Sequence, residues 1–406
     1  MTAPSPVTAA SARRNQLVTV AMVFAVFTGF AFVLPFLPLF VRELGVEEPD
    51  RAALWAGVLI GVAPLLAGLL APMWGRLADR YGHKGIAATA LASYVAILAL
   101  SAAVTRVGEL LALRIGIGLV GGIGPLGLAM ATSQARREET GRAVGLIQAA
   151  QILSAAIGPF AGGILADAIG IRRTFLVTAA LCAVALVLVL AFYEERGPKE
   201  KKAAGLGSGF RAVVTVPGVV ALLVVLFLVN FIGRSFTPIL PLHLSSLGVP
   251  SGHLASATGI LISAYSAAAA TSAWYLGRLS RTRPPRELLV LTLVGGAAAV
   301  APMALVPSFD LILLLAVLLG LVSGGSLTLC YTIGGLMVPE TVRTTAFGFF
   351  SGAALFGGAL SPTVAGLVAH ASLRGIYWVD AALYVVLAVA LARGSALRPV
   401  SPPAAA

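Results

Sequence analysis

The chain has 406 residues, of which 59% are hydrophobic and only 11% are charged. A water-soluble domain carries about 25% charged residues, so this composition excludes an ordinary soluble protein. The net charge of +12 raises the question of nucleic-acid binding. The basic residues gather in short loops between apolar segments, however, which is typical of membrane topology. The sequence therefore predicts a membrane protein that binds no nucleic acid.

Twelve apolar segments follow one another along the chain. Each has about 18 residues or more, which is long enough to cross a hydrocarbon core of roughly 30 Å. They predict an all-α integral membrane protein with twelve transmembrane helices. The expected spans are 16–41, 53–74, 86–104, 108–132, 142–166, 173–193, 217–242, 255–277, 287–305, 309–335, 343–369 and 374–393.

The charges of the loops orient these spans. Most of the 28 lysine and arginine residues fall in the loops and tails on the side that holds both termini, and such an excess marks the cytoplasmic side. We therefore expect both termini in the cytoplasm and the chain in the cell (inner) membrane. The expected parts are a cytoplasmic tail at 1–15, a six-helix bundle at 16–193, a cytoplasmic linker at 194–216, a second six-helix bundle at 217–393 and a flexible cytoplasmic tail at 394–406.

The two bundles have similar sequence landmarks. The first span ends PFLPLFVRELGV and the seventh ends PILPLHLSSLGV, while GRLADRYG after the second span is echoed by GRLSRTRP after the eighth. The matched positions lie 201 to 203 residues apart, as in Pro35 and Pro238, Gly75 and Gly277, and Glu139 and Glu340. A constant offset indicates two parallel repeats around a central cavity, an architecture of secondary transporters.

The loop GRLADRYGHKG, between the second and third spans, has more than the basic residues that topology requires. An acidic residue lies among cations, and glycines permit a tight turn. Such a loop can form ion pairs in one conformation and break them in another. We interpret it as a conformational latch in preference to a purely topogenic loop. The latch residues are Gly75, Asp79, Arg80, Gly82 and Lys84.

The same loop resembles the signature loop of the major facilitator superfamily, with His83 at a position that is usually arginine. LALRIGIGLVGG is similar to the family's second motif, with Arg114 and Gly118 at the matching positions, and GPFAGG resembles the motif of its drug–proton antiporters. Together with PFLPLFVRELGV, these motifs look most like the twelve-helix multidrug exporters of the MdtG and PmrA type. The resemblance implies drug export in exchange for protons, with a proton-transfer role for Arg114.

Several glycines lie inside apolar spans. Those in the fourth span match G-x-G-x-x-G, but no strand precedes them, so a nucleotide site is excluded. Small residues in membrane helices let neighbouring helices pack closely. The expected packing and antiporter-motif residues are Gly118, Gly122, Gly158, Pro159, Gly162 and Gly163.

Charged groups inside the spans are few. Arg114 and Arg234 lie within apolar segments, where an arginine costs about 2.5–3.5 kcal/mol by insertion scales, so neither is expected to face lipid. No aspartate or glutamate lies at the centre of a span. The coupling candidates are Arg114, Asp167 and Asp380, of which the arginine does not deprotonate. His243 and His370 lie at the membrane edges, where solvated side chains are expected.

A cavity with cations and no central carboxylate favours anionic, neutral or amphipathic substrates. The candidate cavity residues are Arg234, Asn230, Gln148, Gln151, Phe27 and Phe231. Phenylalanines in membrane helices also face lipid or packed neighbours, and a structural role is the alternative for both arginines.

The sequence thus predicts a secondary active transporter that exports drugs or toxic small molecules by alternating access, exchanges them for protons and works as a monomer. The alternative is a facilitator or importer of a sugar or other metabolite. A receptor or membrane enzyme is disfavoured because the histidines and cysteines are not spaced as a catalytic or metal-ligand set would be. No catalytic residue, metal or cofactor is expected.

Overall fold

A computed structural model describes residues 9–134, 140–195 and 212–394. Every regular element in these ranges is helical. Eleven helical segments are long and apolar enough to cross a membrane, and the shorter apolar helix Val219–Ile232 lies where the seventh span is expected. The architecture is the predicted all-α membrane fold of twelve spans.

The first half begins with α1 (Ala9–Val33), a short 3-10 turn, η1 (Leu34–Phe36), and α2 (Leu37–Glu43), which together make the first span. The prolines within PFLP lack the backbone N–H that a continuous helix needs, and the helix breaks there. The remaining helices of this half are α3 (Pro49–Tyr81), α4 (His83–Ser101), α5 (Val107–Val120), α6 (Ile123–Gln134), α7 (Thr140–Ile169) and α8 (Ile171–Phe192).

The second half repeats this plan with a longer interruption in its first span. Its α10 (Val219–Ile232) and α11 (Leu240–Ser246) are separated by turns over residues 233–239. The rest are η2 (Ser251–His253), α12 (Leu254–Leu279), α13 (Pro285–Met303), α14 (Phe309–Ser323), α15 (Ser326–Met337), η3 (Glu340–Val342), α16 (Arg343–Ala371) and α17 (Gly375–Arg393).

The fourth and tenth spans are also interrupted, although continuous helices were expected. Gly121, between α5 and α6, has a φ of +100°, which glycine adopts readily. Gly324 and Gly325 separate α14 from α15 at the matching repeat position. The breaks therefore follow the internal symmetry of the chain.

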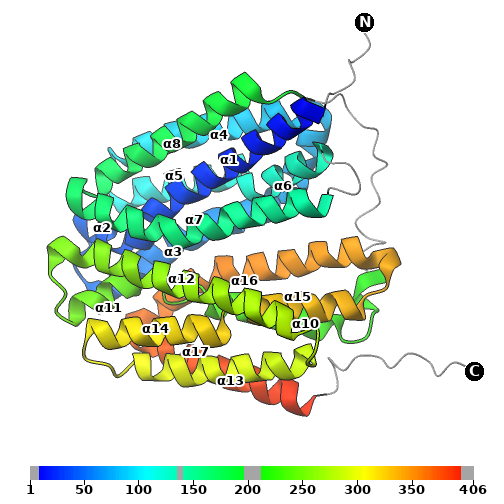
Figure 1. The fold of residues 1–406 in the computed structure, drawn as a ribbon. Helices are drawn as coiled ribbons and strands as arrows, with labels where there is room; N and C mark the ends of the chain where they lie inside the picture. The colour runs from blue at the N-terminus through cyan, green and yellow to red at the C-terminus, as the bar shows by residue number, and fades with distance from the viewer. Residues whose placement is uncertain (1–8, 135–139, 196–211, 395–406) are drawn as a thin grey trace, which may run out of the picture.

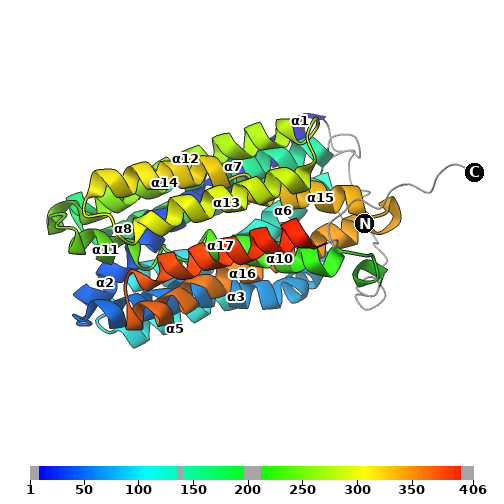
Figure 2. The same ribbon diagram turned by 90° about the horizontal axis from the view of Figure 1, so that it is seen from below.

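The two halves lie against each other along two helix pairs. Figure 1 shows α7 and α12 between the bundles, and Figure 2 shows α3 beside α16. The start of α1 and the end of α17 lie at the same end of the molecule (Figure 1), which we call the terminal end. The opposite end, which carries the turns at Gly45, Gly170 and Gly248, is called the far end.

Candidate functional site

Two reciprocal glycine contacts join the halves near the far end. Gly57 on α3 lies against the backbone of Pro362 on α16, and Gly259 on α12 lies against the backbone of Pro159 on α7. A Cβ atom at either glycine would overlap the proline carbonyl group. The two contacts are equivalent under the repeat, and only glycine allows such close approach of the helices.

A second reciprocal pair extends this seam. Gly163 on α7 packs against Ala255 on α12, and Gly366 on α16 packs against Ala53 on α3. The GPFAGG segment therefore supplies Pro159 and Gly163 to the contact between the halves. The other two glycines of this motif face the first span instead.

Those two glycines pack α7 against α1. A Cβ atom at Gly158 would overlap the side chain of Ala31, and one at Gly162 would overlap the backbone of Phe32. The motif thus touches both the neighbouring span of its own half and the opposite half. Its predicted role in helix packing is consistent with these positions.

Asp167 links the halves through the start of a helix. Its carboxylate accepts hydrogen bonds from the backbone N–H groups of Ala255, at 3.2 Å, and Ser256, at 2.7 Å. These groups belong to the first turn of α12, whose N–H groups have no partner within the helix. A carboxylate at this position also interacts favourably with the helix dipole. This coupling candidate therefore caps a helix of the opposite half.

Other polar contacts cross the seam at the same end. The N–H of Phe160 donates to Oγ of Ser263 at 3.0 Å, and the hydroxyl of Thr363 donates to the carbonyl of Gly57 at 3.3 Å. Nδ1 of His370 lies 3.0 Å from a carboxylate oxygen of Asp50, and 58% of the histidine side chain is exposed. His370 is thus solvated as expected.

Helix faces near the terminal end have more space. A Cβ atom at Gly348 or Gly352 of α16, or at Gly145 of α7, would meet no atom of the described residues within 4 Å. These are the same two helices whose opposite ends form the seam. The contact between the halves is therefore tight near the far end and loose near the terminal end.

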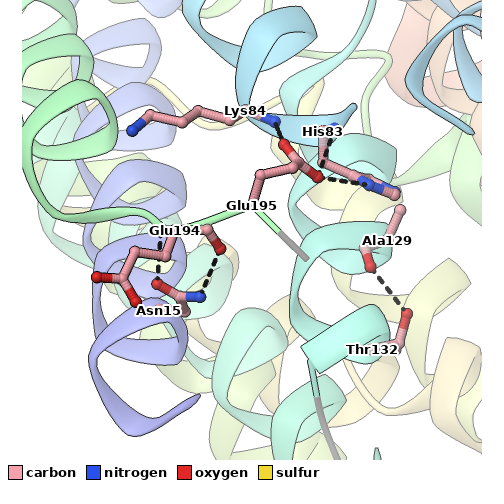
Figure 3. A network of polar contacts seen from close by, with 7 residues as sticks. All are labelled: Asn15, His83, Lys84, Ala129, Thr132, Glu194 and Glu195. Carbon is pink, nitrogen blue, oxygen red and sulfur yellow. Dashed lines mark hydrogen bonds and ion pairs between the residues drawn. The ribbon is translucent and has the colours of Figure 1, made fainter. Parts of the chain in front are cut away.

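The predicted latch loop binds a residue that the sequence did not indicate. Gly82, with a φ of +90°, ends α3 and precedes α4. The carboxylate of Glu195 accepts hydrogen bonds from the backbone N–H groups of His83, at 3.1 Å, and Lys84, at 2.6 Å (Figure 3). Burial alone would raise the pKa of Glu195, but the contact with the side chain of His83 and the backbone hydrogen bonds of Lys84 and His83 outweigh it, so the pKa lies below its ordinary value.

The other latch residues are less constrained. The guanidinium of Arg80 stacks over the ring of Tyr81 at 5.2 Å, and Gly75 has open space around it. The side chain of Asp79 lies outside the described part of the structure. The latch role of this loop stays a prediction.

A neighbouring contact holds the first span to the end of α8. The side-chain amide of Asn15 donates to the carbonyl of Glu194 at 2.9 Å and accepts from its N–H at 3.0 Å (Figure 3). The carboxylate of Glu194 also pairs with Arg14. We call Asn15, Glu194 and Glu195, with the N-terminus of α4, the terminal clasp. The pair of acidic residues directly after the sixth span is visible in the sequence, but their positions do not indicate which segments they contact.

Arg114 is buried in the first half. Its side chain is 3% exposed, and Nε donates to the carbonyl of Leu59 on α3 at 2.9 Å. One turn later, a Cβ atom at Gly118 would lie 2.9 Å from the carbonyl of Ala63. The arginine and the glycine therefore hold α5 against α3.

Two of the predicted cavity residues lie together in the first half. The ring of Phe27 on α1 and the amide of Gln151 on α7 both flank Gly124 of α6, at 3.3 Å and 3.7 Å from a Cβ atom built there. Gln148, one turn before, is exposed. At the break between α5 and α6, Gly122 packs against Pro125.

The predicted cavity residues of the second half lie where the seventh span is broken. Arg234 and Asn230 both approach Gly358 of α16. Arg234 is exposed although it lies well within the length of the span. Phe231 is instead buried and stacks on Phe227 with ring centroids 6.2 Å apart.

Asp380 lies in a buried polar cluster near the far end. It is 0% exposed, its Oδ2 accepts from the hydroxyl of Ser235, and its Oδ1 has no hydrogen-bond partner in the described part of the chain. Nδ1 of His243 lies 2.9 Å from the hydroxyl of Tyr377. His243 is 0% exposed, so its expected solvation is wrong: α11 turns the side chain inward against α17. We call Ser235, His243, Tyr377 and Asp380 the second-half cluster.

Comparison with known proteins gives this geometry a family context. The profile of the Major Facilitator Superfamily matches residues 19–310 and 255–406. The chain is 30% identical to the multidrug resistance protein MdtG of Proteus mirabilis over 358 residues, which cover 87% of this chain and 89% of that protein. It is 32% identical to MdtG of Dickeya zeae over 313 residues, 76% of each chain.

A solved structure has a similar fold. It is a bacterial homolog of the human lysosomal transporter Spinster in an inward-facing, unoccupied conformation, with a TM-score of 0.77 and 17% identity. The match covers 95% of this chain and 96% of that one.

Proposed function

Because this chain belongs to the Major Facilitator Superfamily and is a multi-pass membrane transporter rather than an enzyme, we propose that it exports drugs or other toxic small molecules by alternating access in exchange for protons. The direction and the type of substrate are taken from its similarity to the multidrug resistance proteins MdtG. Alternating access of two repeats around a site at their interface is the general mechanism of such folds.

The observation that carries the proposal is the unequal contact between the halves. Reciprocal contacts at Gly57 and Gly259 hold the far end together, while Gly348 and Gly352 have open space near the terminal end. A transporter that works by alternating access is closed at one end and open at the other in each of its two states, so the contact between its halves is unequal. Since described basic residues such as Arg14, Arg80 and Arg393 lie in helices or loops at the terminal end, that end faces the cytoplasm, and the described state is inward-facing. Both termini are then cytoplasmic, in the inner membrane.

The substrate site lies between the halves, near the middle of the spans. Arg234 and Asn230 line it from the second half, and Phe27 and Gln151 line it from the first. One exposed cation with amide and aromatic neighbours suits anionic, neutral or amphipathic compounds. Both halves of the site belong to one chain, so a monomer suffices.

Transport in liposomes tests this function. The purified chain is reconstituted and given anionic carboxyfluorescein, neutral Nile red or cationic ethidium, with and without an imposed pH gradient. Gradient-dependent flux is expected, with the anionic or neutral dye preferred over ethidium. If the flux of every transported compound is independent of the pH gradient, the chain is a facilitator. If no compound is transported, the proposal is contradicted.

A further inference from the structure

We propose that Asp380 and Ser235 form the proton-binding site of this transporter, and that Tyr377 and His243 connect it toward the far end. The inference rests on the proton exchange proposed above and names the group that holds the proton. It places that group in the second half, away from the signature loop and from Arg114.

The first step is the environment of the carboxyl group. A carboxylate can accept about four hydrogen bonds, but among the described residues Asp380 receives one, from Ser235, and Oδ1 has none. An unpaired buried charge is costly. The pocket therefore fits the neutral acid, and an ionised form requires a change of conformation or the entry of water.

The second step is a count of hydrogens at Ser235. Its hydroxyl has one hydrogen and lies within reach of two acceptors, Oδ2 of Asp380 and the carbonyl of Ile232 at 2.9 Å. When Asp380 is ionised, the serine donates to the carboxylate. When Asp380 is protonated, the acid donates to the serine oxygen and the serine donates to Ile232. The hydrogen bond between Ser235 and Oδ2 is therefore possible in both protonation states, while Oδ1 of the ionised acid still needs water or a change of conformation.

The third step is the position of Ser235 in the broken span. It lies within the turns at residues 233–239, which follow the end of α10. Arg234, the adjacent residue, is exposed and approaches α16. A proton that changes the hydrogen bonding of Ser235 therefore acts on the backbone that carries the exposed cation. This is a direct mechanical connection between the acid and the proposed substrate site.

His243 and Tyr377 extend the cluster. Tyr377 precedes Asp380 by three residues on α17 and so lies on the same helix face. Its hydroxyl contacts Nδ1 of His243, and Nε2 of that histidine is buried without a partner among the residues that the structure describes. Imidazole and phenol groups can both accept and donate a proton. They form a chain of polar groups from Asp380 toward the far end.

Other titratable or charged groups around Asp380 come from the elements packed near it. Tyr265 of α12 interacts electrostatically with both Arg234 and Asp380. Tyr384 of α17 lies close to Asp380, and Arg374, the N-cap of α17, lies close to His243.

The helices packed against α17 add no partner for the acid. On α13, Arg286 donates to carbonyls at the terminal end of α17, and the adjacent Glu287 lies in the first turn of the same helix. On α16, His370 contacts Asp50 of the first half. Among the described residues, Asp380 thus has a hydroxyl group as its hydrogen-bond partner and forms no ion pair.

The internal repeat supplies an independent argument. The positions of His243 and Tyr377 correspond to Phe40 and Phe175 in the first half, whose rings are 5.2 Å apart. Those of Ser235 and Asp380 correspond to Phe32 and to Thr178, which donates to the carbonyl of Gly29. The first half therefore packs the same helices without an acid or an imidazole. Helix packing alone does not require the polar groups of the second half.

Infrared titration of the full chain in lipid bilayers tests the site directly. Protonated carboxylic acids have a distinct carbonyl-stretching band, and the wild-type chain should show one that titrates with pH. Asp380→Asn should lose this band. Asp310→Asn is the matched control, because Asp310 is an exposed acid at the start of α14 and its loss should leave the band unchanged. Retention of the band in Asp380→Asn would overturn the assignment.

Transport measurements then test whether this proton is the coupled one. Asp380→Asn should reduce gradient-driven flux of the exported dye by at least about tenfold, or 1.4 kcal/mol, while downhill flux persists. Equal gradient-driven flux in wild type and variant would overturn the inference. Absence of gradient-driven flux in the wild type would instead remove the proposed function, and the infrared band would still decide whether Asp380 titrates.

A second variant keeps the test decisive if Asp380→Asn does not fold. Ser235→Ala retains the acid and removes its hydrogen-bond partner, so the infrared band and the pH midpoint of transport should both shift. If neither moves in a variant with a wild-type unfolding temperature, the pairing of Ser235 with Asp380 is not part of proton binding.

Discussion

The first and second halves share a backbone plan, but the terminal clasp of the first half and the second-half cluster lie at opposite ends of the molecule. In the first half, Glu194 and Glu195 form the terminal clasp with the signature loop and the first span. In the second half, Asp380 and His243 are buried near the far end. The difference teaches that two halves with one backbone plan can place polar groups in different positions: in the first half they join helix ends, and in the second half we propose that they bind the proton.

Substitutions at the seam between the halves should have the largest effect on transport, because both halves contribute equally to these contacts. Gly57→Leu and Gly259→Leu each place a side chain where a proline carbonyl lies. We expect both variants to lose at least about tenfold in transport rate, since overpacking prevents closure of the far end. Gly348→Leu, at a position with open space, is the control in the liposome assay. Unequal losses in the two variants would show that the contacts are not functionally equivalent.

Reversal of the exposed charge tests the substrate side of the comparison. Arg234→Glu should lower the flux of anionic carboxyfluorescein about tenfold and raise that of ethidium, because the site would change from cationic to anionic. Arg173→Glu, which changes charge at the far end of α8, is the matched control. An unchanged preference among the three dyes would remove Arg234 from the substrate site.

Conversion of the second-half cluster toward its first-half counterpart should separate packing from proton transfer. His243→Phe with Tyr377→Phe reproduces the pairing of Phe40 and Phe175. We expect the free energy of unfolding to change by no more than about 1 kcal/mol, as for volume-conserving core exchanges. The pH profile of transport should nevertheless broaden or move. A profile identical to wild type would limit the proton site to Asp380 and Ser235.

The smallest effect is expected at the terminal clasp. Glu195→Gln keeps the shape of the side chain but removes its charge, and loss of this charged helix cap should cost about 1 kcal/mol. Because the pKa of Glu195 is lowered from 4.5 in the folded state, its contribution is fully present above that ordinary value. It is lost as the pH falls through the lower folded pKa. Hydrogen exchange at the start of α4 should show this acid dependence in the wild type and not in Glu195→Gln.

The spans and the repeat were predictable because each depends on local composition or on matched positions along the chain. Apolar length alone indicates a helix that crosses the membrane, and the helical structure confirms that fold. The glycines of GPFAGG were also recognisable as packing residues, because glycine has no side chain and lets membrane helices approach each other closely.

The second-half cluster could not be predicted in the same way. Ser235 and Asp380 are 145 residues apart, and they meet only because the seventh span breaks after Ile232 and α17 packs beside it. The burial of His243 depends on how α11 turns. The role of Glu195 depends on where α8 ends relative to α4. Each is a consequence of packing between segments, for which the local sequence pattern has no signal.

The contact between Asp50 and His370 has a practical consequence. It joins opposite halves at a surface where both side chains are accessible, so its two members stay together only while the far end is shut. An antibody fragment or cyclic peptide raised against that joined surface would recognise a single state of the protein. In the orientation proposed above, such a reagent would hold the molecule shut from outside the cell, and it would act as an inhibitor without ever entering the substrate site.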